Sequence, residues 1–184
     1  MMLIPSMYIN LIDFFSLNAA EVGLIFGIVS FCFGVGSLPM SFLYNKYGPK
    51  RLIAFSQIGI FISALLVSIS NDVVMFSFSS ILLGLFASIH HPVSLTLISE
   101  TFDKDIAKAN AFHGVFGSIG VSLGPLISFF ALLHFSWHYA FIFTAILNAF
   151  LLPLSLKFIP NTCLLYTSDA ADEGLGVDLG GRRI

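Results

Sequence analysis

Residues 41–51 have the sequence Ser-Phe-Leu-Tyr-Asn-Lys-Tyr-Gly-Pro-Lys-Arg, a short basic turn between two long apolar runs. The runs over 22–44 and 52–70 contain no Lys, Arg, Asp or Glu. Each is close to the roughly 20 apolar residues that cross the hydrocarbon core of a bilayer as a helix. Three of the eight Lys and Arg residues of the chain lie in this turn. The turn therefore indicates two spanning helices and the side of the membrane on which they are joined.

The composition of the whole chain supports a membrane protein. Of its 184 residues 57% are hydrophobic and 10% are charged, and 21 are Phe. Soluble domains are about 25% charged, so too few charges are present to cover a surface that faces water. The basic residues are scattered at the ends of apolar runs, and no nucleic-acid partner is expected. The prediction is an all-α, polytopic membrane protein.

Apolar runs along the chain predict five full transmembrane helices and a partial first one. The first 12 residues would make a helix about 18 Å long, shorter than the 30 Å core of a bilayer, and are interpreted as the outer end of a helix whose first half is missing. Asn18 is a possible cap of the next helix. The predicted helices cover 1–12, 22–44, 52–70, 73–99, 109–135 and 139–158.

The Lys and Arg residues predict the orientation in the membrane. If the runs alternate in direction, the opposite loops hold Asp13, Glu21 and Asp72 and neither Lys nor Arg. Cytoplasmic loops carry the excess of Lys and Arg, so the loop from Ser41 to Arg51 is predicted to be cytoplasmic, with a bacterial inner membrane as the expected location. The residues on the basic side are Lys46, Lys50, Arg51, Lys104, Lys108 and Lys157.

The composition changes at residue 161. Residues 161–184 contain four acidic residues and four glycines and show no helical periodicity. This tail resembles translated read-through of a sequencing adapter, and the alternative is a disordered cytoplasmic tail. In either case it is excluded from the predicted bundle over 1–160.

Small residues recur every three or four positions on one face of two predicted helices. Such faces let another helix backbone approach closely in lipid, either as packing within this chain or as a moving contact surface. The proline after the second stripe is expected to kink its helix. The stripes are Gly23, Gly27, Ser30 and Gly34 in the run over 22–44, and Gly114, Gly117, Gly120, Gly124 and then Pro125 in the run over 109–135.

Besides His134, which is next to the end of the run over 109–135, three histidines lie within spanning segments. His91 and His113 are expected within about one turn of the same depth, on two consecutive helices. Ionisable groups in a spanning helix usually face a bundle interior or a cavity, where histidine binds an anion or carries a proton. The alternative is a neutral histidine bonded to a neighbouring helix. His90 is the weaker candidate, since neighbours in a helix differ in direction by about 100° and cannot both face inward.

No motif predicts catalysis or a cofactor. The sequence has no nucleophile elbow, no His-Glu-x-x-His and no phosphate-binding glycine loop. His134 and His138 have a spacing used by metal ligands, but no acidic partner accompanies them. No catalytic residue, metal or cofactor is therefore expected, although paired histidines leave a histidine-dependent membrane enzyme or haem carrier as an alternative.

The basic turn resembles the signature loop between helices 2 and 3 of major facilitator superfamily transporters, Gly-x-x-x-Asp-x-x-Gly-Arg-Lys/Arg. Gly48, Lys50 and Arg51 match that pattern. Ser41 replaces the leading glycine, and Pro49 replaces an arginine. Asn45 replaces the aspartate; it can still cap a helix, but it brings no charge to the loop.

Other segments carry the same resemblance. Gly120-x-x-x-Gly124-Pro125 is similar to the glycine-proline motif of the family's fifth helix. Phe135-Ser-Trp-His-Tyr-Ala-Phe is similar to the segment that opens helix 6. The His91-Pro92 pair, together with the segment from His113 to Pro125, looks most like the fosmidomycin-resistance and sugar-phosphate-like branches; drug-efflux branches share the glycine-proline motif.

The resemblance implies the N-terminal six-helix half of a transporter that moves a small solute by alternating access, and a coupling proton is a candidate second partner. In the family, helices 2 and 5 line the contact with the C-terminal half, so both small-residue stripes would face that partner, which this chain lacks. The loop from Ser41 to Arg51 would latch the inner gate. A complete six-helix channel or scaffold that oligomerises through the stripes is the remaining alternative.

Overall fold

The computed structural model describes residues 3–102 and 104–160, which form eight α-helices and no strand. The helices are α1 (Leu3–Ser6), α2 (Tyr8–Phe15), α3 (Ala19–Ser37), α4 (Met40–Tyr47), α5 (Pro49–Ser68), α6 (Val73–Thr101), α7 (Ile106–His134) and α8 (Trp137–Phe158). Five of them, α3 and α5 to α8, are long and apolar enough to cross a membrane. The predicted all-α, polytopic membrane fold is confirmed. The predicted tail over 161–184 lies outside the described residues.

A break at Leu38 and Pro39 divides the run over 22–44, for which a single helix is predicted, into α3 and α4. Proline has no backbone N–H, and its ring clashes with the carbonyl group four residues earlier, so a proline within a helix breaks or kinks it. The Leu38 N–H instead bonds the Val35 carbonyl oxygen at 3.1 Å. As a result α4 is a separate short helix that belongs to the basic turn rather than to the span.

The N-terminal segment is likewise two short helices, α1 and α2, separated at Met7. A capping box then starts α3. The Asn18 side chain accepts hydrogen bonds from the backbone N–H groups of Ala20 and Glu21 at 2.9 and 3.0 Å, and the Glu21 carboxylate accepts one from the Asn18 N–H at 2.8 Å. The cap expected at Asn18 is confirmed. The remaining spans begin and end within a few residues of their predicted bounds.

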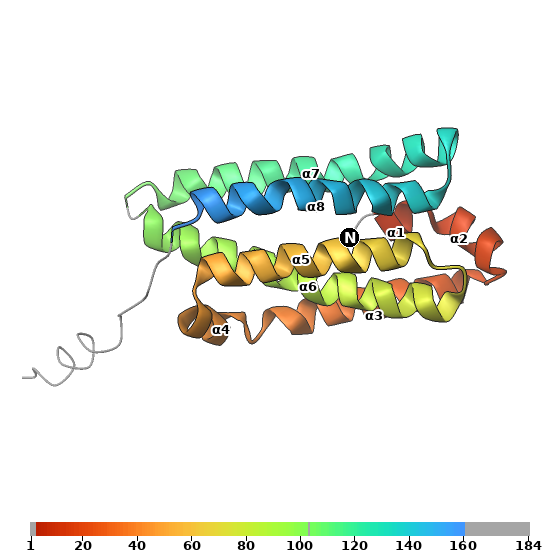
Figure 1. The fold of residues 1–184 in the computed structure, drawn as a ribbon, viewed down its shortest axis with the longest axis horizontal. Coiled ribbons are helices and arrows are strands. Elements are labelled where there is room, and N and C mark those ends of the chain that lie inside the picture. Colours follow the sequence, from red (N-terminus) through yellow and green to blue (C-terminus); the bar gives the residue numbers. More distant parts are fainter. Residues whose placement is uncertain (1–2, 103, 161–184) are drawn as a thin grey trace, which may run out of the picture.

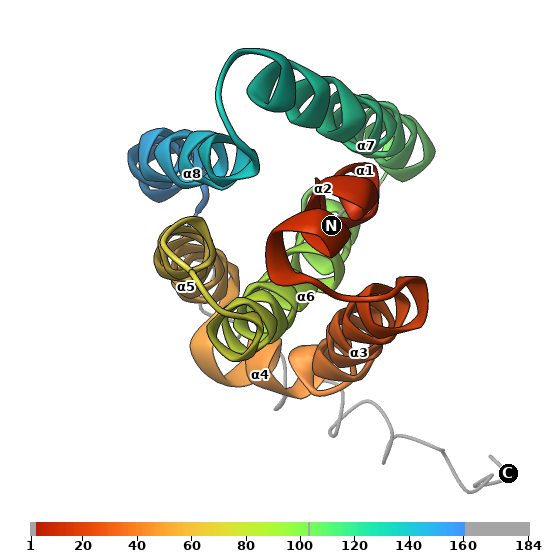
Figure 2. The same cartoon turned by 90° about the vertical axis from the view of Figure 1, so that its right-hand side faces the viewer.

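The long helices run side by side, with α5 between α8 and α6, and α6 between α5 and α3 (Figures 1 and 2). The α4–α5 turn, the α6–α7 turn and the end of α8 lie at one end of the bundle, and the α2–α3, α5–α6 and α7–α8 connections lie at the other. The spans therefore alternate in direction, as the charge argument requires. Within residues 3–102 and 104–160, the segments that carry Lys and Arg share one end.

Two clusters of buried side chains hold the bundle together. One cluster, at the end without basic segments, includes Phe76, Trp137 and Phe141; the other, at the basic end, includes Tyr44 and Val93. The Trp137 ring is only 3% exposed and meets the Phe76 ring edge-on, with centroids 5.6 Å apart. Trp137 is therefore a core residue at the start of α8.

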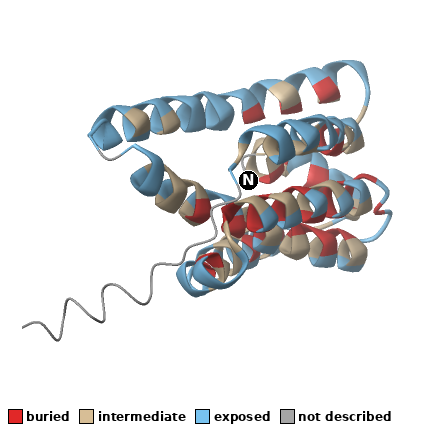
Figure 3. Ribbon diagram, turned by 60° about the vertical axis from the view of Figure 1, so that its left-hand side comes forward, coloured by how far each residue is buried: buried red, intermediate tan, exposed pale blue. Residues whose placement is uncertain are grey.

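Burial is uneven across the helices. Buried residues are concentrated on α5 and α6, whereas α3, α7 and α8 are mostly exposed (Figure 3). At the α3–α6 contact, Gly84 lies directly against the backbone of Val29: a Cβ atom added to Gly84 would be 2.9 Å from the Val29 carbonyl oxygen. A glycine outside the two predicted stripes thus sets the distance between these two helices.

The Gly84→Ala variant is expected to be less stable by about 1–3 kcal/mol, because the added methyl group must push the α3 backbone away from α6. Thermal unfolding in detergent measures this loss. Gly27→Ala is the matched control, since a Cβ atom at Gly27 meets nothing within 4 Å. Equal stability of the two variants would contradict the close α3–α6 contact.

Candidate functional site

The structure brings His91 of α6 and His113 of α7 together. Their rings are stacked, with centroids 5.4 Å apart and planes inclined by 26°. His113 Nε2 lies 3.4 Å from His91 Nδ1, within reach of a hydrogen bond in which one imidazole donates to the other. His91 lies about three turns before the end of α6, and His113 about two turns after the start of α7. The similar depth expected from the sequence is therefore found in the fold.

The contact of the two imidazoles has a chemical consequence. One ring nitrogen of each residue is used in the contact; His91 is exposed and His113 is partly buried. His91 Nε2 and His113 Nδ1 lie outside this contact, and an imidazole nitrogen can donate or accept a hydrogen bond according to its tautomer.

His90 does not join this contact. Its Nδ1 atom lies 3.3 Å from the Ser94 hydroxyl oxygen on the same helix, which points the ring along α6. The helical rotation between adjacent residues separates His90 from His91 in direction, as expected.

Six of the predicted interface glycines lie on open faces. A Cβ atom added to any of them would meet nothing within 4 Å in the described structure. They do not pack the neighbouring helices of this chain, and so the packing interpretation does not apply to them. These glycines are Gly23, Gly27 and Gly34 of α3, and Gly114, Gly117 and Gly120 of α7.

The end of the second stripe differs from the rest. Gly124 is buried, whereas the adjacent Pro125 is exposed. The helix α7 continues through Pro125 to His134. The open glycine face of α7 therefore covers Gly114 to Gly120 and stops one turn before the proline.

The basic turn is built around Gly48, which is both the C-cap of α4 and the N-cap of α5. Its φ of 76° and ψ of 160° lie in a region that is essentially restricted to glycine. Its N–H bonds the Tyr44 carbonyl oxygen at 2.8 Å. Asn45 and Ser41 lie within α4 and are exposed, so Asn45 does not cap a helix. Lys50 and Arg51 occupy the first turn of α5.

A contact that the sequence patterns do not reveal ties this turn to α6. The buried Tyr44 side chain donates its hydroxyl hydrogen to the Glu100 carboxylate near the end of α6. Glu100 thus supplies an acidic group beside the turn, although the signature position holds the uncharged Asn45. The two partners are 56 positions apart in the chain, so only the fold shows the pair.

Gly48→Ala is expected to destabilise the chain by about 1–3 kcal/mol, since a side chain at this φ and ψ is strained. Thermal unfolding in detergent measures the effect. Asn45→Ala, at an exposed position of the adjacent helix, is expected to change stability by less than about 0.5 kcal/mol. A larger loss for Asn45→Ala would indicate a capping role that the described contacts lack.

No group of three or more His, Cys, Asp or Glu side chains is arranged to hold a metal ion within residues 3–102 and 104–160. His138 stacks on Trp137 with ring centroids 3.8 Å apart, and its Nδ1 atom lies 3.1 Å from the Ser136 hydroxyl oxygen. This histidine has a packing role at the start of α8.

The structure thus combines spanning helices, a histidine pair between α6 and α7, and open glycine faces on α3 and α7. The profile of the Major Facilitator Superfamily matches residues 1–172. The chain belongs to this superfamily, which confirms the resemblance found in the sequence motifs.

Three curated relatives illustrate the range of the family. The chain is 27% identical over 141 residues to a probable nitrate transporter of Staphylococcus epidermidis, covering 74% of this chain and 35% of the relative. It is 26% identical over 139 residues to a probable L-galactonate transporter of Escherichia coli, covering 73% and 30%. It is 33% identical over 122 residues to a class H tetracycline resistance protein of Pasteurella multocida, covering 65% and 30%. The chain thus spans about a third of the length of these relatives.

Proposed function

We propose that the chain forms the N-terminal half of a secondary transporter that moves a small anionic solute by alternating access, with His91 and His113 in the binding site. The observation that carries this proposal is the contact of the two imidazoles between α6 and α7. In alternating access two half-bundles rock about a site near the middle of the membrane, and spanning helices with ionisable groups line such sites.

An anion is the favoured solute class because of the charges available in the spans. Within 73–99 and 109–135 histidines are the only residues that can become cationic. A protonated histidine pair can therefore attract an anion without a permanent charge in the membrane. The relatives named for nitrate and L-galactonate are named for anions, which supports the same class. A coupling proton could bind to the same pair.

The open glycine faces of α3 and α7 are the proposed contact with a C-terminal half. They fit this role because a second bundle can approach the backbone closely at glycine. The loop from Ser41 to Arg51 is the proposed inner latch, held to α6 through Tyr44 and Glu100. Its cytoplasmic location remains supported by the excess of Lys and Arg at that end.

Family membership favours a carrier over the two alternatives. A scaffold or channel that oligomerises through the glycine faces would use the same open surfaces. In the haem-carrier alternative the iron would have to lie between two imidazoles, and here these rings contact each other directly.

The test is transport by the complete gene product containing this chain, purified and reconstituted in proteoliposomes. The probes are labelled nitrate, L-galactonate and tetracycline. The proposal predicts saturable uptake of at least one of the two anions. Uptake of tetracycline alone would contradict the anion assignment, and the absence of uptake for all three would contradict both the assignment and the transport site.

A further inference from the structure

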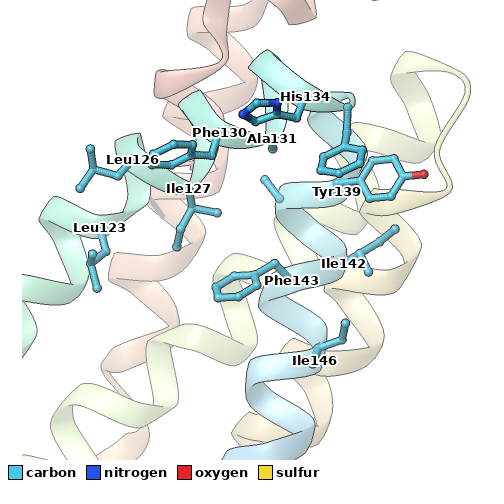
Figure 4. A pocket seen from close by; sticks show the side chains of 12 residues that line it. Leu123, Leu126, Ile127, Phe130, Ala131, His134, Tyr139, Ile142, Phe143 and Ile146 are labelled. Carbon is cyan, nitrogen blue, oxygen red and sulfur yellow. The ribbon is translucent and has the colours of Figure 1, made fainter.

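A groove between α7 and α8 has no role in the proposed transport site. It has a volume of about 530 Å³ and is lined almost entirely by carbon atoms. Ala131 and Ala140 are buried at its base, whereas Phe130 and Phe143 are about half exposed. Figure 4 shows His134 and Tyr139 together at one end of the groove and Leu123 and Ile146 toward the other.

The length of the groove matches one leaflet of a bilayer. Along α7 the distance from Leu123 to His134 is about 16 Å at 1.5 Å per residue. Half of a hydrocarbon core is about 15 Å. The groove therefore runs from the α7–α8 turn, at the end of the bundle without basic segments, to roughly the middle of the membrane.

The polarity of the lining residues changes along the groove as it does from the tail to the headgroup of a phospholipid. The part nearest the middle of the membrane is aliphatic and aromatic. The end near the α7–α8 turn has the His134 imidazole and the phenol of Tyr139, which is 50% exposed. Tyrosine is enriched at the level of lipid headgroups, and both side chains can donate a hydrogen bond to a phosphate or ester oxygen there.

Bulky walls distinguish this groove from a site for another helix. Helices that associate in lipid use small residues, which let the backbones approach. The rim of the groove is formed by Leu126, Phe130, Phe143 and Ile146, and the glycines of α7 from Gly114 to Gly120 are not among its lining residues. Between these side chains lies an apolar groove that can hold one flexible hydrocarbon chain.

We propose that this groove binds one acyl chain of a glycerophospholipid from the leaflet that meets the α7–α8 turn, with the headgroup beside His134 and Tyr139. The site would hold the lipid in place against the bundle, unlike the exchangeable lipid around the other spanning helices. This proposal does not depend on the solute that the protein transports.

The test uses the complete gene product in nanodiscs that contain a phosphatidylethanolamine with a photoactivatable diazirine in one acyl chain. After irradiation, mass spectrometry measures labelling of the groove residues Phe130 and Phe143 relative to Ile62, an exposed residue of α5. We expect several-fold enrichment in the groove. Labelling equal to that of Ile62 would overturn the proposal, and so would protection of the groove or protein–protein adducts, because these would mean that protein covers it.

Two variants sharpen this test. Ile146→Trp fills the groove at its inner end and is expected to remove most of the enrichment. Phe150→Trp, one turn further along α8 and outside the groove, is the matched control and is expected to retain it. Enrichment that is unchanged by Ile146→Trp would overturn the assignment of the acyl chain to this groove.

Discussion

His91→Ala is expected to lower the apparent affinity for the transported anion by roughly 10- to 100-fold, because a hydrogen bond to a charged group contributes about 1.5–3 kcal/mol. Initial uptake rates in proteoliposomes, measured over a range of anion concentrations, give this apparent affinity.

Asn148→Ala is the control for this experiment. It removes a polar group from a spanning helix, but among the described residues the Asn148 side chain donates to the Thr144 carbonyl oxygen of its own helix, at 2.9 Å, and to no other helix. Uptake by this variant is expected to match the wild type. Unchanged uptake by His91→Ala would contradict the assignment of the histidine pair to the solute site.

Gly117→Leu is expected to lower transport by roughly tenfold or more while leaving the stability of the purified protein nearly unchanged. The leucine side chain has open space around it in this chain, where a Cβ atom meets nothing within 4 Å. It would, however, fill the face proposed to contact the C-terminal half, and overpacking at a close contact costs about 1–3 kcal/mol. Uptake rates and thermal unfolding, measured on the same preparation, separate the two effects.

A volume-conserving swap on the same helix provides the comparison. Ile119→Leu, at a position 47% exposed, is expected to transport normally. Normal transport by Gly117→Leu would contradict the proposal that the open face of α7 contacts the C-terminal half during transport.

Much of the fold could be predicted because the bilayer imposes simple requirements on the sequence. The uncharged runs mark the spans, and the Lys and Arg residues gather at one end. The Asn18 cap could also be predicted, since Glu21 follows at the spacing of a capping box. These signals depend on residue type and on spacing over a few residues.

Other features depend on which way a side chain points or on partners far apart in the chain. Gly84 and Gly27 look alike in the sequence, yet only Gly84 meets a neighbouring backbone. The depth of His91 and His113 could be predicted, but their ring contact depends on the rotation of two helices. The break at Pro39 lies within an uncharged run, where hydropathy gives no indication of it.

The central claim is that His91 and His113 act as one binding unit, and a double-mutant cycle tests it most directly. Uptake is measured for wild type, His91→Ala, His113→Ala and the double variant, with the anion that the wild-type protein transports. If the two histidines form one binding unit, either single substitution abolishes the binding by that unit. Uptake by the double variant is then no lower than uptake by either single variant. Independent effects that multiply in the double variant, or single variants that transport like the wild type, would contradict the account.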